Sequence, residues 1–230
     1  MHQTEAPDPV TTRLREGFER IALVLRSDLW TASGKAGLNP TQAQTLALLA
    51  ARAHGLRAKE IAAHLAVSAP TIAGTLAALE RKGLVARASD PADARAACVN
   101  LTDEGRRLGV ALTQSASQVT SALAALSPAQ QAELLLSQIR IIRFLQLAGA
   151  VPAQRLCVSC RHFRPNAYPG AAQLHHCDFV NAAIGDRDLR LDCGEHEAAE
   201  PSVQSANWTA FDAGRPPLRA TSDTRRTTPI

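Results

Sequence analysis

Residues 57–87 read RAKEIAAHLAVSAPTIAGTLAALERKGLVAR, and this run predicts two consecutive helices. In its first part, over residues 57–65, the side chains of Ile61, Ala62 and Leu65 share one helical face. Such a face packs against a hydrophobic core, so we expect a short helix here.

A second helix is predicted after a short turn. Ser68 is a favourable N-cap because its side-chain oxygen accepts a backbone N–H of the first turn. Ile72, Leu76 and Leu79 then recur at helical spacing. Gly83 ends the helix, because glycine adopts the left-handed backbone of a C-cap. The two helices and their turn predict a helix-turn-helix.

Two short β-like runs follow the second helix. Residues 84–88 and 96–101 flank a turn-rich loop at 89–94. A two-stranded hairpin in this position is the wing of a winged helix-turn-helix. The expected fold class is therefore mainly α with a small β wing.

A winged helix-turn-helix binds DNA with its second helix in the major groove. Here the N-terminal half of that helix would present Ser68, Thr71 and Thr75 to base edges. Arg95 in the wing would enter the adjacent minor groove, where a narrow groove concentrates negative potential. A structural interpretation stays open beside each contact: Ser68 as a cap alone, Thr71 in packing, and Arg95 as a solvated arginine.

Helices are also predicted on both sides of the motif. Residues at roughly helical spacing predict the first one: Leu14, Phe18, Ile21, Leu25 and Trp30. Another begins at Asn39, followed by proline at an early helical position. After the wing, Thr102 caps a helix expected to continue to about Leu123, and Ser127 begins a last helix ending near Leu147.

The combination resembles the MarR family of transcriptional regulators over about residues 10–148. The resemblance is carried by these runs: EIA (60–62), LAVS (65–68), TI (71–72), LERKGLVAR (79–87), DP (90–91), DAR (93–95) and LTDEGR (101–106). It implies an obligate homodimer in which the first helix and the last two interlock. Two winged helices would then bind a pseudo-palindromic operator in double-stranded DNA, with half-sites about one helical turn apart. It also implies a pocket for a small organic effector, such as a phenolic compound, between the dimer helices and the winged helix.

One position departs from the family's pattern. Gly74 stands where many members carry an arginine in the recognition helix. Its loss removes a strong phosphate or guanine contact, so we expect operator affinity to depend more on the wing and on Arg81, Lys82 and Arg87.

Cysteines define a second region. Cys157, Cys160, Cys177 and Cys193 lie close together in the sequence, and only Cys98 lies elsewhere. In a chain without an export signal, such a group favours metal binding or redox chemistry over disulfides. Cys98 is interpreted as a small packed hydrophobic residue.

Four thiolates suit both tetrahedral zinc and a four-iron cluster. The CxxC pair followed by two widely separated cysteines resembles the ligand spacing of high-potential iron–sulfur proteins, which implies a 4Fe-4S cluster held by all four. The Gly-Trp that precedes that family's last cysteine is absent, and Leu191-Asp192 stands there instead. Zinc, free thiols and a disulfide switch remain alternatives, and the neighbouring histidines are expected to be hydrogen-bond donors around the ligands or exposed rings.

Composition narrows the remaining possibilities. Only 3% of residues are aromatic, which argues against a stacking surface for single-stranded nucleic acid. The net charge of +4 permits DNA binding without requiring it. No apolar stretch has the length of a membrane span and no secretory signal is recognised, so a cytoplasmic protein with no membrane partner is expected. No nucleophile–base pair, phosphate loop or HExxH motif indicates an enzyme.

Three zones are therefore expected. Residues 1–150 form the DNA-binding and dimerisation domain, 151–200 a small irregular metal module with four cysteines, and 201–230 a disordered tail rich in Pro, Ser, Thr and Arg. The predicted function is transcription regulation in which the cluster changes operator affinity in response to a redox, oxygen or iron signal. The alternative within regulation is an organic-ligand sensor with a structural zinc, and electron transfer is a third class.

Overall fold

The computed structural model describes residues 8–52, 54–90, 93–114 and 117–213, and the side chains of residues 90 and 93–96 lie outside this description. The chain divides into two compact units. Unit 1 comprises Met1–Gln154 together with Asp192–Glu195, and unit 2 comprises Arg155–Leu191 together with His196–Ile230. The short segment Asp192–Glu195 thus belongs with the first unit although its neighbours in sequence belong to the second.

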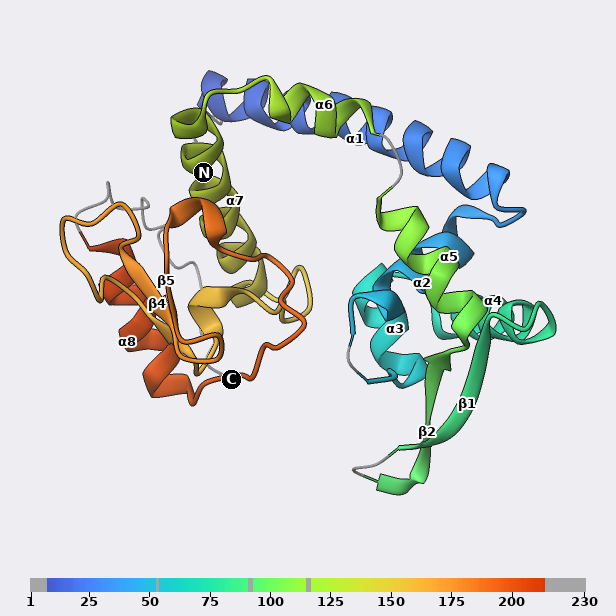
Figure 1. Cartoon of the computed structure of the whole chain (residues 1–230). Coiled ribbons are helices and arrows are strands. Elements are labelled where there is room, and N and C mark those ends of the chain that lie inside the picture. The colour runs from blue at the N-terminus through green and yellow to red at the C-terminus, as the bar shows by residue number, and fades with distance from the viewer. Residues whose placement is uncertain (1–7, 53, 91–92, 115–116, 214–230) are drawn as a thin grey trace, which may run out of the picture. The chain divides into compact units, whose positions relative to one another are not determined.

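Unit 1 is mainly helical (Figure 1). Its helices are α1 (Pro9–Lys35), α2 (Pro40–Ala50), α3 (Ala58–Leu65), α4 (Ala69–Arg81), α5 (Asp103–Thr113), α6 (Gln118–Ala124) and α7 (Pro128–Leu147).

Side-chain caps form at the four helix starts where the sequence predicts them. Asn39, Ser68, Thr102 and Ser127 each accept a backbone N–H from the third residue beyond them, at 2.9–3.3 Å. All four starts are confirmed, because capping depends on residues that are adjacent in sequence.

The single helix predicted from Thr102 to Leu123 is wrong. The structure has α5 and α6 in its place, separated after Thr113. The Ser117 hydroxyl donates to the Asp28 carboxylate of α1 at 2.8 Å, and the same carboxylate accepts the Gln118 N–H at 3.0 Å. Ser117 Oγ also accepts the Thr120 N–H at 3.4 Å, so α6 has a local N-cap that Asp28 joins to α1, and helical periodicity alone does not reveal this new start.

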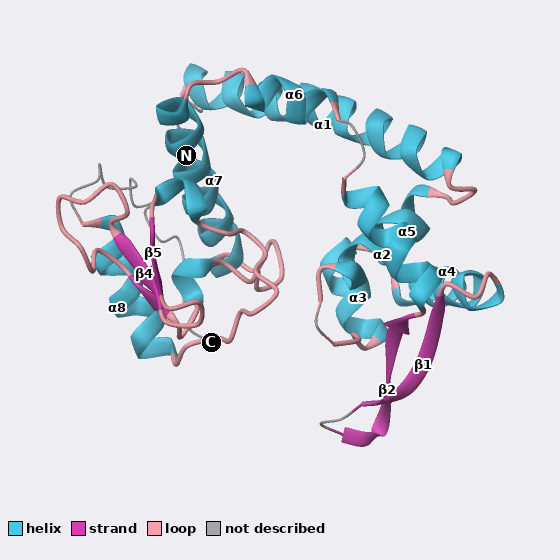
Figure 2. Ribbon diagram, in the orientation of Figure 1, coloured by secondary structure: helices cyan, strands magenta, loops and turns pink. Residues whose placement is uncertain are grey.

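The wing is an antiparallel hairpin of β1 (Val85–Asp90) and β2 (Asp93–Leu101), drawn in magenta in Figure 2. Its strands extend further into the predicted 89–94 loop than expected. At the base of the hairpin, Leu56 and Val99 exchange two backbone hydrogen bonds of 2.8 and 3.1 Å. This bridge fixes the wing to the segment that leads into α3.

The core of unit 1 lies between α2, α3, α4 and the base of the wing. Its buried members are Leu38, Ala43, Leu46, Leu49, Ile61, Ala62, Ile72, Leu76, Leu79, Leu84, Val85 and Val99. The wing and the helix-turn-helix are therefore built on one common core.

Unit 2 combines short turns with a small sheet. Its elements are η1 (Cys157–Ser159), β3 (Phe163–Arg164), β4 (His175–Cys177), β5 (Ala182–Ile184), η2 (Asp186–Asp188) and α8 (Pro201–Asp212). The sheet is antiparallel in the order β3-β4-β5.

The predicted disordered tail over 201–230 is wrong in its first part, because α8 is an ordered helix. Phe211 of α8 is only 1% exposed and packs against Phe163 and His175, with ring centroids 6.2 and 5.6 Å apart. The buried ring of Phe211 holds α8 to the core of unit 2, so the segment is ordered although few of its residues are hydrophobic. Residues 214–230 lie outside the described part of the chain.

Within the described ranges, no single helix is both long enough and apolar enough to cross a membrane. The one pair of helices that reaches such a length together, α3 with α4, is bent by 113°.

Candidate functional site

The bend between α3 and α4 has the geometry of a helix-turn-helix. Their angle of 113° falls in the range of about 90–120° typical of this motif. Ala66 makes the turn with a left-handed backbone (φ 51°), and the Val67 N–H donates to the Ala62 carbonyl at 3.0 Å. With the wing directly after α4, unit 1 contains the predicted winged helix-turn-helix (Figure 1).

Ser68 and Thr71 lie exposed at the N-terminus of α4, as the sequence predicts. Ser68 Oγ accepts the Thr71 N–H at 3.3 Å and lies 2.8 Å from Thr71 Oγ1. Ser68 is therefore an N-cap, and the two hydroxyls share one hydrogen bond. One hydroxyl hydrogen of this pair remains for an outside acceptor.

The expectation that Thr75 faces DNA is wrong. Thr75 is only 8% exposed, and its hydroxyl donates to the Thr71 carbonyl one turn earlier at 2.9 Å. It lies on the same buried side of α4 as Ile72, Leu76 and Leu79. The helical phase places its side chain in the core, so it is removed from the candidate DNA contacts.

The three predicted cations near the end of α4 lie at the surface, and two of them have partners within the unit. Lys82 Nζ donates to the Gly37 carbonyl at 2.5 Å, and Arg87 Nε pairs with Glu80 Oε1 at 2.7 Å. The Arg87 side chain is 50% exposed and keeps its terminal guanidinium nitrogens for another acceptor. Arg81 is exposed in the last turn of α4.

Arg95 belongs to β2, which places it in the wing. Its side chain lies outside the described residues, so its minor-groove contact stays a prediction.

In unit 2, the CxxC pair forms a tight turn. The Cys160 N–H donates to the Cys157 carbonyl at 2.9 Å. Cys157 and Arg190 exchange two contacts: Cys157 N–H donates to the Arg190 carbonyl, and Arg190 N–H donates to the Cys157 sulfur, both at 3.2 Å. An N–H directed at a cysteine sulfur stabilises a thiolate, as it does around metal centres.

The third cysteine lies at the same end of the small sheet. Cys177 of β4 pairs with Phe163 of β3, which follows Cys160 by three residues. The Asp178 N–H donates to the His162 carbonyl at 2.8 Å and closes this end. Cys157, Cys160 and Cys177 therefore lie in unit 2, at or near the same end of the small sheet.

Cys193 is in the Asp192–Glu195 segment that belongs with unit 1. None of the five cysteines, all of which the structure describes, is in a disulfide. Among the residues that the structure describes, no three or more His, Cys, Asp and Glu side chains are grouped as a metal ion requires. Metal or cluster binding by Cys157, Cys160, Cys177 and Cys193 thus stays a prediction. Cys98 is 5% exposed in the wing, in agreement with a packed role.

His175 has a structural role that the sequence did not indicate. It is fully buried, its Nδ1 accepts the Asn166 N–H at 3.0 Å, and its Nε2 lies 3.0 Å from Asp186 Oδ1. Because Nδ1 is an acceptor, Nε2 carries the hydrogen and donates to Asp186. The ring is therefore neither exposed nor directed at a cysteine in these contacts.

Ser159 and His196 lie 3.0 Å apart, Oγ to Nε2. The Ser159 hydroxyl also donates to the Leu156 carbonyl at 3.0 Å, so it accepts from the imidazole. This orientation leaves the histidine unable to take the serine proton, which is the opposite of what a nucleophilic pair needs.

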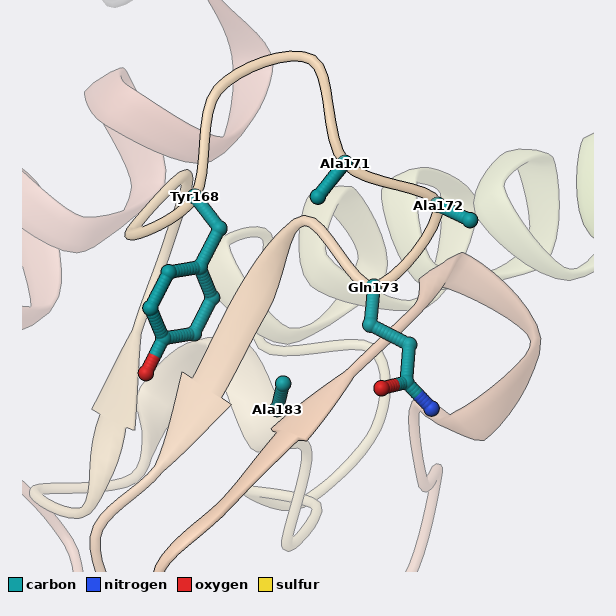
Figure 3. Close-up of a pocket in the computed structure, with 5 residues that line it drawn as sticks. All are labelled: Tyr168, Ala171, Ala172, Gln173 and Ala183. Carbon is teal, nitrogen blue, oxygen red and sulfur yellow. The ribbon is translucent and has the colours of Figure 1, made fainter.

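A shallow, open depression lies on unit 2 beside the sheet (Figure 3). It is lined by Tyr168, Ala171, Ala172, Gln173 and Ala183. None of the predicted site residues lines it, and the Tyr168 hydroxyl bonds His176 Nδ1 at 3.0 Å.

Comparison with known proteins gives one family match. Residues 36–96 match the model of the MarR family, and this span covers α2, α3, α4 and most of the wing. None of the curated proteins matches the chain.

Solved structures of other proteins are also similar to this chain. A MepR mutant from a multidrug-resistant S. aureus clinical isolate is 25% identical, covering 58% of this chain and 97% of its own, with a TM-score of 0.49. The S. aureus MepR–DNA complex is 24% identical, covering 57% and 97%, with a TM-score of 0.47. CouR from Rhodococcus jostii RHA1 bound to p-coumaroyl-CoA is 23% identical, covering 64% and 96%, with a TM-score of 0.47.

The fold of unit 1 and the family match over residues 36–96 agree, and this segment is a winged helix similar to that of the MarR family.

Proposed function

We propose that the chain is a homodimeric transcription regulator that binds double-stranded DNA at a pseudo-palindromic operator. The observation that carries this proposal is the pair α3 and α4, bent by 113°, followed directly by the wing within a segment that matches the MarR family. This geometry suits insertion of α4 into a major groove, with the wing beside it.

The apolar surface of α1 supports the homodimer. Leu14, Phe18, Ile21 and Leu25 recur at helical spacing and are 46–60% exposed, and Trp30 is 70% exposed. A continuous apolar stripe of this kind on one helix is typical of an interface. A second copy of α1 and its neighbouring helices would cover it, and a twofold dimer matches a palindromic site.

The cysteines would give this regulator its signal input. We assign Cys157, Cys160, Cys177 and Cys193 as ligands of a four-iron cluster, supported by their spacing, by the absence of a disulfide between them and by the backbone N–H that Arg190 directs at the Cys157 sulfur. When bound, such a cluster supplies a reversible one-electron couple and sensitivity to oxygen. The backbone N–H of Arg190 would donate to a metal-bound Cys157 thiolate whether the metal is iron or zinc.

One contact explains how the cysteines would influence DNA binding. Asp192 immediately precedes Cys193 and pairs with the buried Arg52, which follows α2 in the winged-helix unit. A change in the ligation of Cys193 would act on this ion pair through one peptide bond. Coupling of about 1–3 kcal/mol would change operator affinity roughly 5- to 150-fold.

The cofactor is tested by purifying the full-length chain without oxygen and recording its visible spectrum with iron, sulfide and zinc analysis. We expect a brown protein with about four irons and four sulfides per chain. A colourless protein with about one zinc and no sulfide would replace the cluster by a structural zinc, and a small organic effector would then be the remaining candidate signal. Cys157→Ser should lose the cofactor, whereas the matched variant Cys98→Ser should keep it.

DNA binding and its regulation are tested separately. A random duplex library is selected with the full-length chain, and the selected duplex is then measured by gel shift with the cofactor intact and after its removal. We expect a palindromic preference and different affinities in the two states. Equal affinity in both states would remove the sensor role and leave DNA binding standing.

A further inference from the structure

The exposed face of α4 carries unusually small side chains for a helix that enters a major groove. Ala69, Pro70, Thr71, Ala73 and Gly74 are all exposed. The longer apolar side chains of α4 point into the core, and the first exposed long side chain is that of Arg81 in the last turn. Between Ser68 and Arg81 this face offers carbon atoms and two hydroxyls.

Those hydroxyls cannot read a base edge in the bidentate way. Ser68 Oγ caps the helix and shares a hydrogen bond with Thr71 Oγ1, so the pair keeps a single hydrogen to donate. Bidentate recognition of guanine or adenine needs Arg, Lys, Asn or Gln. The only side chain of those types in α4 is Arg81, at its C-terminal end.

Gly74 makes this small face of α4 smaller still. Glycine weakens a helix interior relative to alanine. A Cβ placed on Gly74 would meet no atom of the described chain within 4 Å, and its backbone is not in the left-handed region. Packing within these residues therefore does not require a glycine here, and the backbone of α4 is open to close approach by an outside molecule.

We propose that α4 reads its operator through close apolar contact with thymine 5-methyl groups, with Ala69, Ala73 and Gly74 as the specificity-determining positions. The thymine methyl is the one apolar feature that a base pair presents in the major groove, and alanine and the threonine methyl suit it. This inference rests on the proposed DNA-binding function and names what that site recognises. It implies A·T pairs opposite the first two turns of α4, with local DNA shape adding to the preference.

The experiment uses the full-length chain and the duplex selected from a random library. Each thymine is replaced in turn by deoxyuridine, which removes the methyl and keeps the base-pairing edge. We expect replacement of a contacted thymine to weaken binding about fourfold, the loss implied by exposing one methyl-sized group. Deoxyuridine outside the protected region of the duplex is the control and should leave affinity unchanged.

A variant tests the same face from the protein side. Gly74→Arg places a long guanidinium where the structure has open space, so the fold should be retained. Repeated selection with this variant should shift the preference towards guanine opposite residue 74, because arginine binds guanine in a bidentate manner. Replacing the base opposite residue 74 by deoxyuridine should then no longer give the specific loss of affinity expected for the wild-type chain.

The outcomes distinguish the methyl readout from DNA binding itself. If one duplex is preferred but no deoxyuridine replacement weakens its binding, the methyl readout is overturned and the regulator stands. If no duplex is preferred over the unselected pool, sequence-specific regulation fails and this inference fails with it.

Discussion

Arg52 and Asp192 form an ion pair between residues 140 positions apart in sequence, with Nη1 and Oδ2 separated by 2.6 Å. The Arg52 side chain is only 4% exposed, and that of Asp192 is 40% exposed. Gly194 lies beside the same point, since a Cβ on it would be 3.9 Å from the Ala51 carbonyl oxygen. The segment before and after Cys193 is thus anchored to the C-terminal end of α2.

Asp192→Asn should destabilise unit 1, because it leaves a buried guanidinium without its carboxylate. Removing one partner of a fully buried pair costs about 3–5 kcal/mol, and the partial exposure of Asp192 reduces this to about 2 kcal/mol. Urea denaturation followed by circular dichroism measures the change. The surface pair of Arg107 with Glu104 is the control, and Glu104→Gln should change stability by less than about 0.5 kcal/mol. Equal midpoints for Asp192→Asn and the wild-type chain would contradict a stabilising role for this pair.

Arg95→Ala should weaken operator binding and reduce the slope of log affinity against log salt by about one. Both effects follow if this wing arginine lies in a minor groove and displaces a counterion there. Fluorescence anisotropy at several salt concentrations measures them. Arg107→Ala, in a side chain that is 76% exposed on α5, should have the smaller effect, and identical curves for the two variants would refute the wing contact.

Phe18→Glu should convert the dimer to a monomer without unfolding it. Phe18 is 46% exposed within one chain, so a charge there is tolerated until a partner must cover it. Sedimentation equilibrium gives the mass, and operator affinity should fall because two half-sites are no longer bound together. Ser27→Glu, at an exposed neutral position on the opposite side of α1, is the matched charge change and should remain dimeric. A dimeric Phe18→Glu variant would show that this stripe is not the interface.

Glu197 should titrate below an ordinary glutamate. Its pKa is lowered first by the hydrogen bond from His162, at 3.1 Å, and further by the charge and hydrogen bond of Arg161, at 2.9 Å. Because the folded-state pKa is lowered, the stabilisation is present above the usual glutamate pKa and is lost as the pH falls through the lowered value. A carboxyl NMR titration checks the midpoint, which Arg161→Ala should raise. An unchanged midpoint in that variant would leave His162 as the sole cause.

The sequence predicted those parts of the fold that depend on neighbouring residues. Helix caps at Asn39, Ser68 and Ser127 involve partners three residues away, so their positions can be read directly. The helix-turn-helix and the wing followed from periodicity and turn residues over about thirty positions. Thr75 is an exception, because the helical phase of α4 buries its side chain although a hydroxyl suits a DNA contact.

Features that depend on distant contacts were missed. The break between α5 and α6 depends on Asp28, the order of α8 depends on the packing of Phe211, and the burial of Arg52 depends on Asp192. Each involves a partner outside any sequence window, although Ser117 is also a local N-cap and so a sequence signal for the start of α6. The four cysteines are a different case. Their spacing predicts a metal centre, but the structure assigns three of them to unit 2 and Cys193 to unit 1, so experiment must test whether the centre forms.

Two glycines in neighbouring parts of unit 1 should respond to alanine in opposite directions. At Gly74 the added Cβ enters open space and the helix gains propensity, so Gly74→Ala should raise the free energy of unfolding by about 1 kcal/mol. At Gly105 the same Cβ would lie 1.8 Å from the Leu84 carbonyl oxygen, so α5 must move away from the wing and stability should fall. Urea denaturation of both variants measures their free energies of unfolding. Gel shifts on the selected duplex measure their DNA affinities. A more stable Gly74→Ala protein that binds DNA more weakly would mean that the glycine serves the DNA contact at the expense of stability, whereas a less stable one would show that residue 74 has a structural role within the chain.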